Sequence, residues 1–126
     1  MTHSTRSRAL TVAAAVLTGV TVWAVAGPVA GIRIAVDDQA VGVAQVAIVS
    51  LLAGLAAWVL FAVLARFTSR ATPIWTAIAA SVLAVSLTGP LGATSTAAGI
   101  TLACLHLLVG GVIIFGLRAS AKRQSD

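Results

Sequence analysis

His106 is the residue of this sequence whose type and position suggest chemistry most directly, because an imidazole can change its charge near neutral pH. It lies near the centre of an apolar run over 96–117, where an ionisable group is costly and usually faces the interior of a helix bundle. The favoured interpretation is a neutral histidine that hydrogen bonds to another helix. The alternative is a group that relays protons or contacts a ligand.

Small residues are predicted to share one helical face with His106. Gly99, Ala103, His106 and Gly110 follow one another at spacings of three or four residues, so a neighbouring helix could pack closely against this face. We therefore expect His106 to point into the bundle. The hydroxyl groups expected at a similar depth on the other helices are those of Ser81, Ser50 and Thr18.

A second group of hydroxyl side chains gathers where the third and fourth apolar runs meet. Its members are Ser86, Thr88, Thr94, Ser95 and Thr96. They could line a polar entrance to the bundle. The favoured interpretation is local, because such hydroxyls often bond to nearby backbone groups, and Thr94 or Ser95 would then cap the last helix.

The residues needed for most other chemistries are missing from the sequence. There is no Glu, and the three Asp residues lie outside the apolar runs. Cys104 is two positions from His106, which places it on roughly the opposite face of a helix, so we expect no metal site. No Ser/His/Asp set, catalytic carboxylate pair or phosphate-binding glycine loop is present. We predict a protein that is not an enzyme and needs no cofactor.

The composition indicates which elements hold these residues. Of the 126 residues, 60% are hydrophobic and 9% are charged, whereas a soluble domain has about a quarter charged residues. Each membrane-spanning helix needs about 20 apolar residues, and membrane strands would instead alternate in polarity over about 10 residues. We therefore predict an all-α membrane protein, a bundle of four transmembrane helices over 9–30, 41–65, 73–90 and 96–117.

The basic residues predict the orientation of this bundle. The expected connections are an outer loop over 31–40, a cytoplasmic loop over 66–72, and cytoplasmic tails over 1–8 and 118–126. Seven of the eight Lys and Arg residues then share one side, and only Arg33 is on the other. By the positive-inside rule, both termini lie in the cytoplasm and the protein in the cytoplasmic membrane. Basic residues clustered in this way offer no continuous face to nucleic acid, despite the net charge of +5.

Three tryptophans lie near the expected ends of the spans. Trp58 and Trp75 fall toward the cytoplasmic side and Trp23 toward the outer side. This placement is typical of interfacial aromatic residues. A ligand-binding aromatic cage is disfavoured, because the three residues are divided between the two sides.

Two features leave alternatives open. Ala24-Val25-Ala26 resembles a signal-peptidase site, and cleavage there would leave three spans; an apolar run longer than the usual range of about 7–15 residues favours the uncleaved chain. Gly27-Pro28 and Gly89-Pro90 end the first and third runs, as in a weak parallel repeat of two helical hairpins. The favoured interpretation of these pairs is that Gly-Pro ends helices with or without a repeat.

The last third of the sequence resembles a known family. The resemblance rests on SLTGP at 86–90, ATSTAA at 93–98, LHLL at 105–108 and IIFGL at 113–117, and extends more loosely over 55–66 and 72–75. These segments resemble an uncharacterised actinobacterial family of four-helix membrane proteins, defined as a domain of unknown function. The resemblance implies this fold and a membrane location, without an activity or functional residues.

These observations predict a non-enzymatic integral membrane protein that acts through helix–helix association. Besides the lipid bilayer, its partners would be further copies of itself or the subunits of a larger membrane complex, for which it would be a structural or accessory subunit. The alternative is a small transporter or permeation protein with a polar path near His106. Transport requires a polar cavity that reaches His106 from one side, whereas association requires packed side chains around it.

Overall fold

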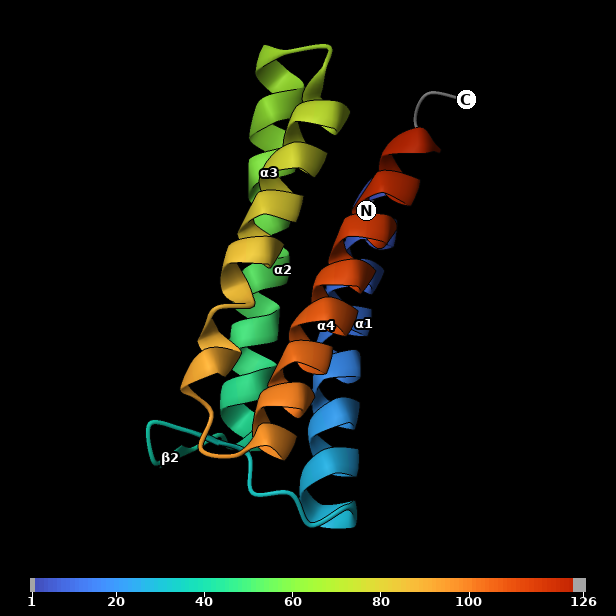
Figure 1. Ribbon diagram of the computed structural model, residues 1–126. Helices are drawn as coiled ribbons and strands as arrows, with labels where there is room; N and C mark the ends of the chain where they lie inside the picture. Colours follow the sequence, from blue (N-terminus) through green and yellow to red (C-terminus); the bar gives the residue numbers. More distant parts are fainter. Residues whose placement is uncertain (1, 124–126) are drawn as a thin grey trace.

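The computed structural model describes residues 2–123 and is built from four long helices (Figure 1). These are α1 (His3–Ala24), α2 (Val43–Phe67), α3 (Ala71–Ser86) and α4 (Thr96–Lys122). Together with the short helices that extend α1 and α3, all four are long and apolar enough to cross a membrane. The prediction of an all-α four-helix bundle is confirmed.

The first helix begins earlier, and the last helix ends later, than the sequence predicted. α1 begins at His3 instead of residue 9, because the Thr2 hydroxyl caps it by accepting a hydrogen bond from the backbone N–H of Thr5 at 3.4 Å. α4 continues to Lys122 instead of ending at residue 117. The expected tails are therefore largely helical within the described residues. Apolarity indicates the length of a membrane span, whereas backbone hydrogen bonding and capping decide where a helix ends.

The third helix is shorter than predicted, and the two Gly-Pro segments differ from each other. α3 ends at Ser86, and the predicted last turn is replaced by a separate 3₁₀ helix, η2 (Gly89–Gly92). Pro28 instead lies in a π-helix, η1 (Val25–Val29), which continues α1. The two segments therefore differ in conformation, as the favoured interpretation without a repeat allows.

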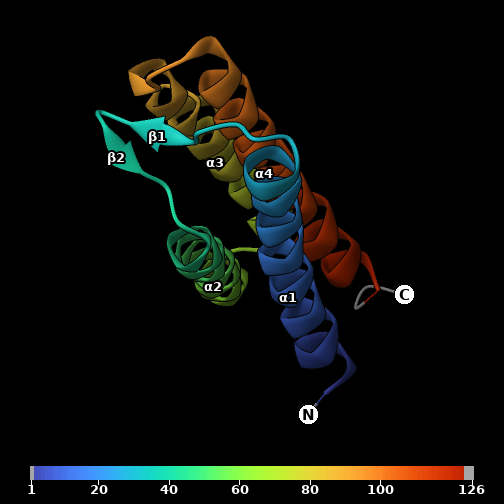
Figure 2. The ribbon, with the colours of Figure 1, turned by 90° about the horizontal axis from the view of Figure 1, so that it is seen from below.

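The connection between α1 and α2 contains a small β-hairpin where the sequence predicted a loop. β1 (Ala35–Val36) pairs with β2 (Gln39–Ala40) in antiparallel register. Asp37 and Asp38 form the turn, with φ values of 47° and 63°, the left-handed values that a type I′ turn requires. Figure 2 shows this hairpin extending across one end of the bundle. We call this the hairpin end, and the opposite one the terminal end.

The hairpin is attached to the connection between α3 and α4. The backbone N–H of Asp37 donates to the carbonyl of Gly92 at 3.1 Å, and the N–H of Thr94 donates to the carbonyl of Ala35 at 3.2 Å. Two connections distant in sequence therefore share backbone hydrogen bonds, and they cover the hairpin end together.

Helix α1 lies between α2 and α4, and glycines bring these helices close. A Cβ added to Gly54 of α2 would lie 3.1 Å from Val12 of α1, and one added to Gly19 of α1 would lie 3.1 Å from Val46 of α2. Small residues allow such an approach where the bilayer provides no hydrophobic driving force between helices. The core formed in this way consists of Ala15, Phe61, Trp75, Val109, Ile113 and Leu117.

The position of α1 bears on the alternative of signal-peptide cleavage. Cleavage after Ala26 would remove Ala15 and Val12, both buried in the bundle. The glycine contacts with α2 would be lost with them. Loss of α1 would therefore expose the face of α2 that packs against it.

The start of α1, the end of α4 and the connection between α2 and α3 lie at the terminal end (Figure 1). The hydroxyls of Ser7 and Ser120 are 2.8 Å apart there, which places the first turns of α1 beside the last turns of α4. The structure thus gathers seven basic residues at this end, with Arg33 at the hairpin end: Arg6, Arg8, Arg66, Arg70, Arg118, Lys122 and Arg123.

A groove beside His106 as the candidate functional site

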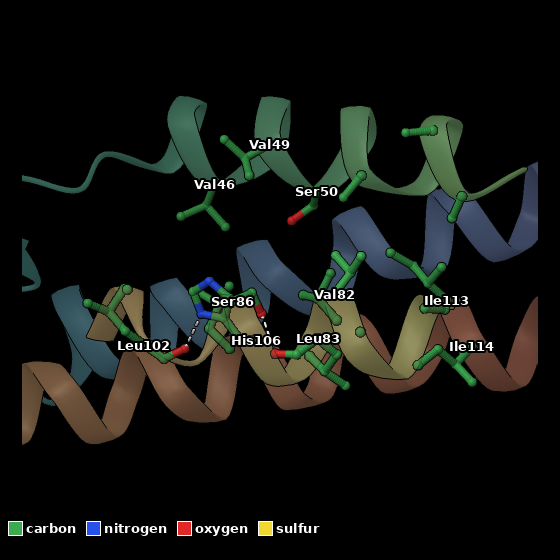
Figure 3. Close-up of a pocket in the computed structure, with 18 of the residues that line it drawn as sticks. Val46, Val49, Ser50, Val82, Leu83, Ser86, Leu102, His106, Ile113 and Ile114 are labelled. Carbon is green, nitrogen blue, oxygen red and sulfur yellow. Dashed lines mark hydrogen bonds between the residues drawn. The ribbon is translucent and has the colours of Figure 1, made fainter. Parts of the chain in front are cut away.

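A groove of about 720 Å³ lies between α2, α3 and α4. Pockets for small molecules typically have volumes of about 300–1,000 Å³. Most of the side chains that line the groove are aliphatic (Figure 3). The few that carry polar groups for hydrogen bonding are Gln39, Gln45, Ser50, Ser86 and His106, apart from the indole of Trp75.

The groove opens to the side, between α2 and α3. Val49 of α2 and Val82 of α3 both line it, yet they are 58% and 62% exposed. At the terminal end it is closed by Trp75, whose indole N–H donates to the carbonyl of Ala57 at 2.9 Å and so ties α3 to α2. At the other end the hairpin contributes Val36 to its wall. A molecule dissolved in the bilayer could therefore enter from the side.

His106 projects from α4 into this groove and is half-buried (Figure 3). Its Nδ1 lies 2.7 Å from the carbonyl oxygen of Leu102, one turn earlier in the same helix. Because a carbonyl oxygen can only accept a hydrogen bond, this contact assigns the hydrogen to Nδ1, and in the neutral tautomer the lone pair is then on Nε2. The sequence predicted a bond to another helix. In the structure the donor nitrogen bonds within α4 and leaves an acceptor in the groove.

Only one of the three hydroxyls expected near His106 lines the same groove. That residue is Ser50 of α2. Ser81 is exposed, Thr18 is on α1 outside the groove, and both donate to carbonyls of their own helices. Ser86, which the sequence assigned to a different cluster, lines the groove instead. The rotation of α3 about its own axis decides which serine lines the groove, and the sequence does not reveal it. In the structure Ser86 faces the groove and Ser81 faces away from it.

Ser50 differs from the other buried hydroxyl residues of the helices. Thr11, Thr101 and Ser120 all donate to a carbonyl four residues earlier. The Ser50 side chain is 3% exposed, and within residues 2–123 its hydroxyl makes no hydrogen bond. It lies over Gly19, where an added Cβ would be 2.8 Å from its Oγ. An unsatisfied hydroxyl in an apolar wall costs about 1–3 kcal/mol unless a bound molecule completes its hydrogen bonding.

The hydroxyl cluster at the hairpin end serves mainly as local capping. The Ser95 hydroxyl accepts a hydrogen bond from the backbone N–H of Ala98 at 3.1 Å and caps α4, one of the two caps that the sequence predicted. Thr94 and Thr96 on either side are exposed and do not line the groove. The polar entrance considered from the sequence is therefore not formed by these residues.

The small residues on the His106 face of α4 lie against α3 and η2. A Cβ added to Gly110 would lie 2.6 Å from Leu83, and one added to Gly99 would lie 3.5 Å from the carbonyl oxygen of Pro90. Ala103 is half-buried. This face therefore allows α3 to approach, as the sequence predicted, while the tighter packing of α4 against α1 uses other residues.

Trp75 faces the core of the bundle, whereas the sequence predicted an interfacial aromatic residue. Its side chain is fully buried in the core, and its ring meets that of Phe61 edge-on with centroids 5.7 Å apart. Trp58 is half-buried beside the same core. The sequence shows how far along the helix Trp75 lies, whereas only the helix orientation shows that it points inward.

Residues 2–123 contain no group of three His, Cys, Asp or Glu side chains that could hold a metal ion. Cys104 is exposed on α4, away from the groove. The chemistry that the groove can offer is therefore hydrogen bonding at a few points within a large apolar surface.

Four apolar helices of membrane length, with a groove that opens between two of them, define a small integral membrane protein. The chain belongs to the DUF6069 family, a family of unknown function that it matches over residues 1–123. No curated protein and no solved structure matches the chain. The expectation that the chain belongs to a family of unknown function is confirmed over these residues.

Proposed function

We propose that this protein is a non-enzymatic accessory protein of the cytoplasmic membrane that binds a hydrophobic molecule in the groove between α2, α3 and α4. The observation that carries the proposal is the combination of aliphatic walls with an opening between two membrane-length helices. Such a groove buries the apolar surface of a ligand against its walls, and a few polar groups fix the orientation of the ligand.

The surroundings of His106 favour this function over the two considered from the sequence. A cavity reaches His106, as transport requires, but few of its lining residues are polar. Such walls do not support a continuous path for water or ions. Because the cavity reaches His106, packed side chains do not enclose this residue completely, as association alone would require. Association with further copies or with a larger complex remains compatible with the many large apolar side chains exposed on all four helices.

The orientation is part of the proposal. Seven basic residues at the terminal end and one at the hairpin end support a cytoplasmic location for both termini. The groove then lies within the bilayer, and the hairpin covers its outer end.

A groove-filling substitution tests this function. Ala53 lines the groove on α2, and Ala44, nine residues earlier, is exposed and outside it. We expect Ala53→Phe to lower the lipophilic molecules that co-purify with the protein at least fivefold, as measured by mass spectrometry of organic extracts from nanodiscs. Ala44→Phe is the matched control and should leave them unchanged. Equal retention by wild type and both variants would contradict the proposal.

A further inference from the structure

We infer that the groove recognises a neutral lipophilic alcohol, whose hydroxyl binds between Nε2 of His106 and the hydroxyl of Ser50. The inference rests on the proposed binding function and names the chemical class of the ligand. In Figure 3 the two side chains enter the same space from opposite walls, Ser50 from α2 and His106 from α4. Each wall contributes one polar side chain, and the proposed hydroxyl-binding site needs both.

The hydrogen-bonding capacity of the two residues selects a hydroxyl group. Nδ1 of His106 already donates to Leu102, so Nε2 of the neutral ring can only accept. The Ser50 hydroxyl makes no hydrogen bond within residues 2–123 and is able to donate. A single alcohol satisfies both, because its hydrogen binds Nε2 while its oxygen accepts from Ser50. An ether or ester lacks the hydrogen that Nε2 needs, and so does a carboxylate.

The depth of the site excludes a charged headgroup. His106 is ten residues from the start of α4 at Thr96, which corresponds to roughly 15 Å along the helix axis. The hydrocarbon core of a bilayer is about 30 Å thick, so the site is near its middle. A phosphate or carboxylate would have to lose its hydration there without a cationic partner, whereas a neutral hydroxyl needs only two hydrogen bonds.

The remainder of the groove suits the hydrocarbon part of such a molecule. From His106 toward the terminal end it is lined by aliphatic side chains, among them Leu60, Ile113 and Ile114, and it ends at Trp75. The opening beside Val49 and Val82 admits a chain or ring from the surrounding lipid. The alcohol would thus be anchored at mid-depth with its apolar part along α2 and α3.

Competition between matched probes tests the inference. The full-length protein in phosphatidylcholine nanodiscs is labelled with a diazirine-bearing octadecanol, and labelled peptides are mapped by mass spectrometry. We expect saturable labelling of α2 and α3 at the groove. Unlabelled 1-octadecanol should displace the probe at least tenfold more effectively than its methyl ether or stearic acid does. Equal competition by the alcohol and the ether would overturn the inference, as would stronger competition by the acid.

Variants of the serines give an independent readout. We expect Ser50→Ala to weaken probe binding about fivefold to tenfold, whereas Ser50→Thr, which keeps the hydroxyl, should retain it. Ser81→Ala is the control, because Ser81 is an exposed hydroxyl outside the groove. Unchanged binding by Ser50→Ala contradicts the assignment. Groove labelling without preference for the alcohol rejects the ligand class and keeps the binding function, whereas no groove labelling in the wild type rejects both.

Discussion

Trp75 shows how a single side chain closes the groove at its terminal end. The indole N–H crosses from α3 to the Ala57 carbonyl of α2, and the ring meets Phe61 edge-on. The guanidinium carbon of Arg8 also lies 5.2 Å from the centroid of the Phe61 ring, a cation–π contact that links α1 to the same cluster. One aromatic pair therefore joins three helices.

Replacing Trp75 should weaken the bundle measurably. Trp75→Phe removes the hydrogen bond to Ala57 and leaves a gap in the core, so we expect a loss of about 1–3 kcal/mol in the free energy of unfolding. Steric-trapping measurements in detergent micelles would determine it. Trp58→Phe is the control, because Trp58 is only half-buried, and its loss should be smaller. Equal losses for the two variants would argue against the bridging role of Trp75.

At the scale of elements, α1 and α4 are held close by a glycine. A Cβ at Gly116 would overlap the side chain of Thr11, whose hydroxyl donates to the Ser7 carbonyl and whose β-branched side chain is stiff. One turn further on, Ser7 and Ser120 bring their hydroxyls together between the same two helices. The close approach of these helices therefore depends on the absence of a side chain at one position.

Alanine at two glycines of α4 should have opposite effects. Gly116→Ala forces Thr11 or the helix axis to move, and we expect it to destabilise the bundle by about 1–3 kcal/mol, as overpacking does. Gly111 has nothing within 4 Å of an added Cβ. Gly111→Ala should therefore be neutral or stabilising by up to about 1 kcal/mol, the usual helix preference of alanine over glycine. The midpoints of thermal unfolding in detergent would compare them, and a stable Gly116→Ala protein would contradict the packing.

At the scale of the whole molecule, the charges are separated along the bundle axis. The terminal end holds seven basic residues, and the hairpin end holds Arg33 with Asp37 and Asp38. The hairpin is also bonded to the α3–α4 connection. The two ends therefore differ in both charge and structure.

Cysteine labelling would determine the orientation in the membrane. In a Cys104→Ala background, Ala40→Cys places a thiol on the hairpin and Ser69→Cys places one in the connection between α2 and α3; both positions are exposed. We expect a membrane-impermeant maleimide to label residue 40 in intact cells and residue 69 only after permeabilisation. The reverse pattern would show that the terminal end faces outward.

Particular residues show how far the sequence alone could predict the site. The sequence predicts Thr94 or Ser95 as the cap of α4, and Ser95 takes that role, because capping depends on neighbouring residues in the chain. His106 can be predicted from the sequence, because an ionisable residue within a membrane span is unusual, and it lines the groove. The sequence predicts Ser50 as one of three hydroxyls at the depth of His106 and places Ser86 in a different cluster. Which of them shares a groove with His106 depends on the rotation of each helix about its axis, and an almost uniformly apolar helix gives little periodic signal of that rotation.

The sequence by itself determined the class of the protein, the number of helices, and the gathering of basic residues at one end, because hydropathy and charge act along the chain. Tertiary structure decided that α1 packs closely between α2 and α4 while a groove remains beside α3. It also decided that Trp75 is buried and that the Ser50 hydroxyl is left without a hydrogen bond inside the described chain. In lipid all faces of such helices are apolar, so the contacts of small side chains select the packing.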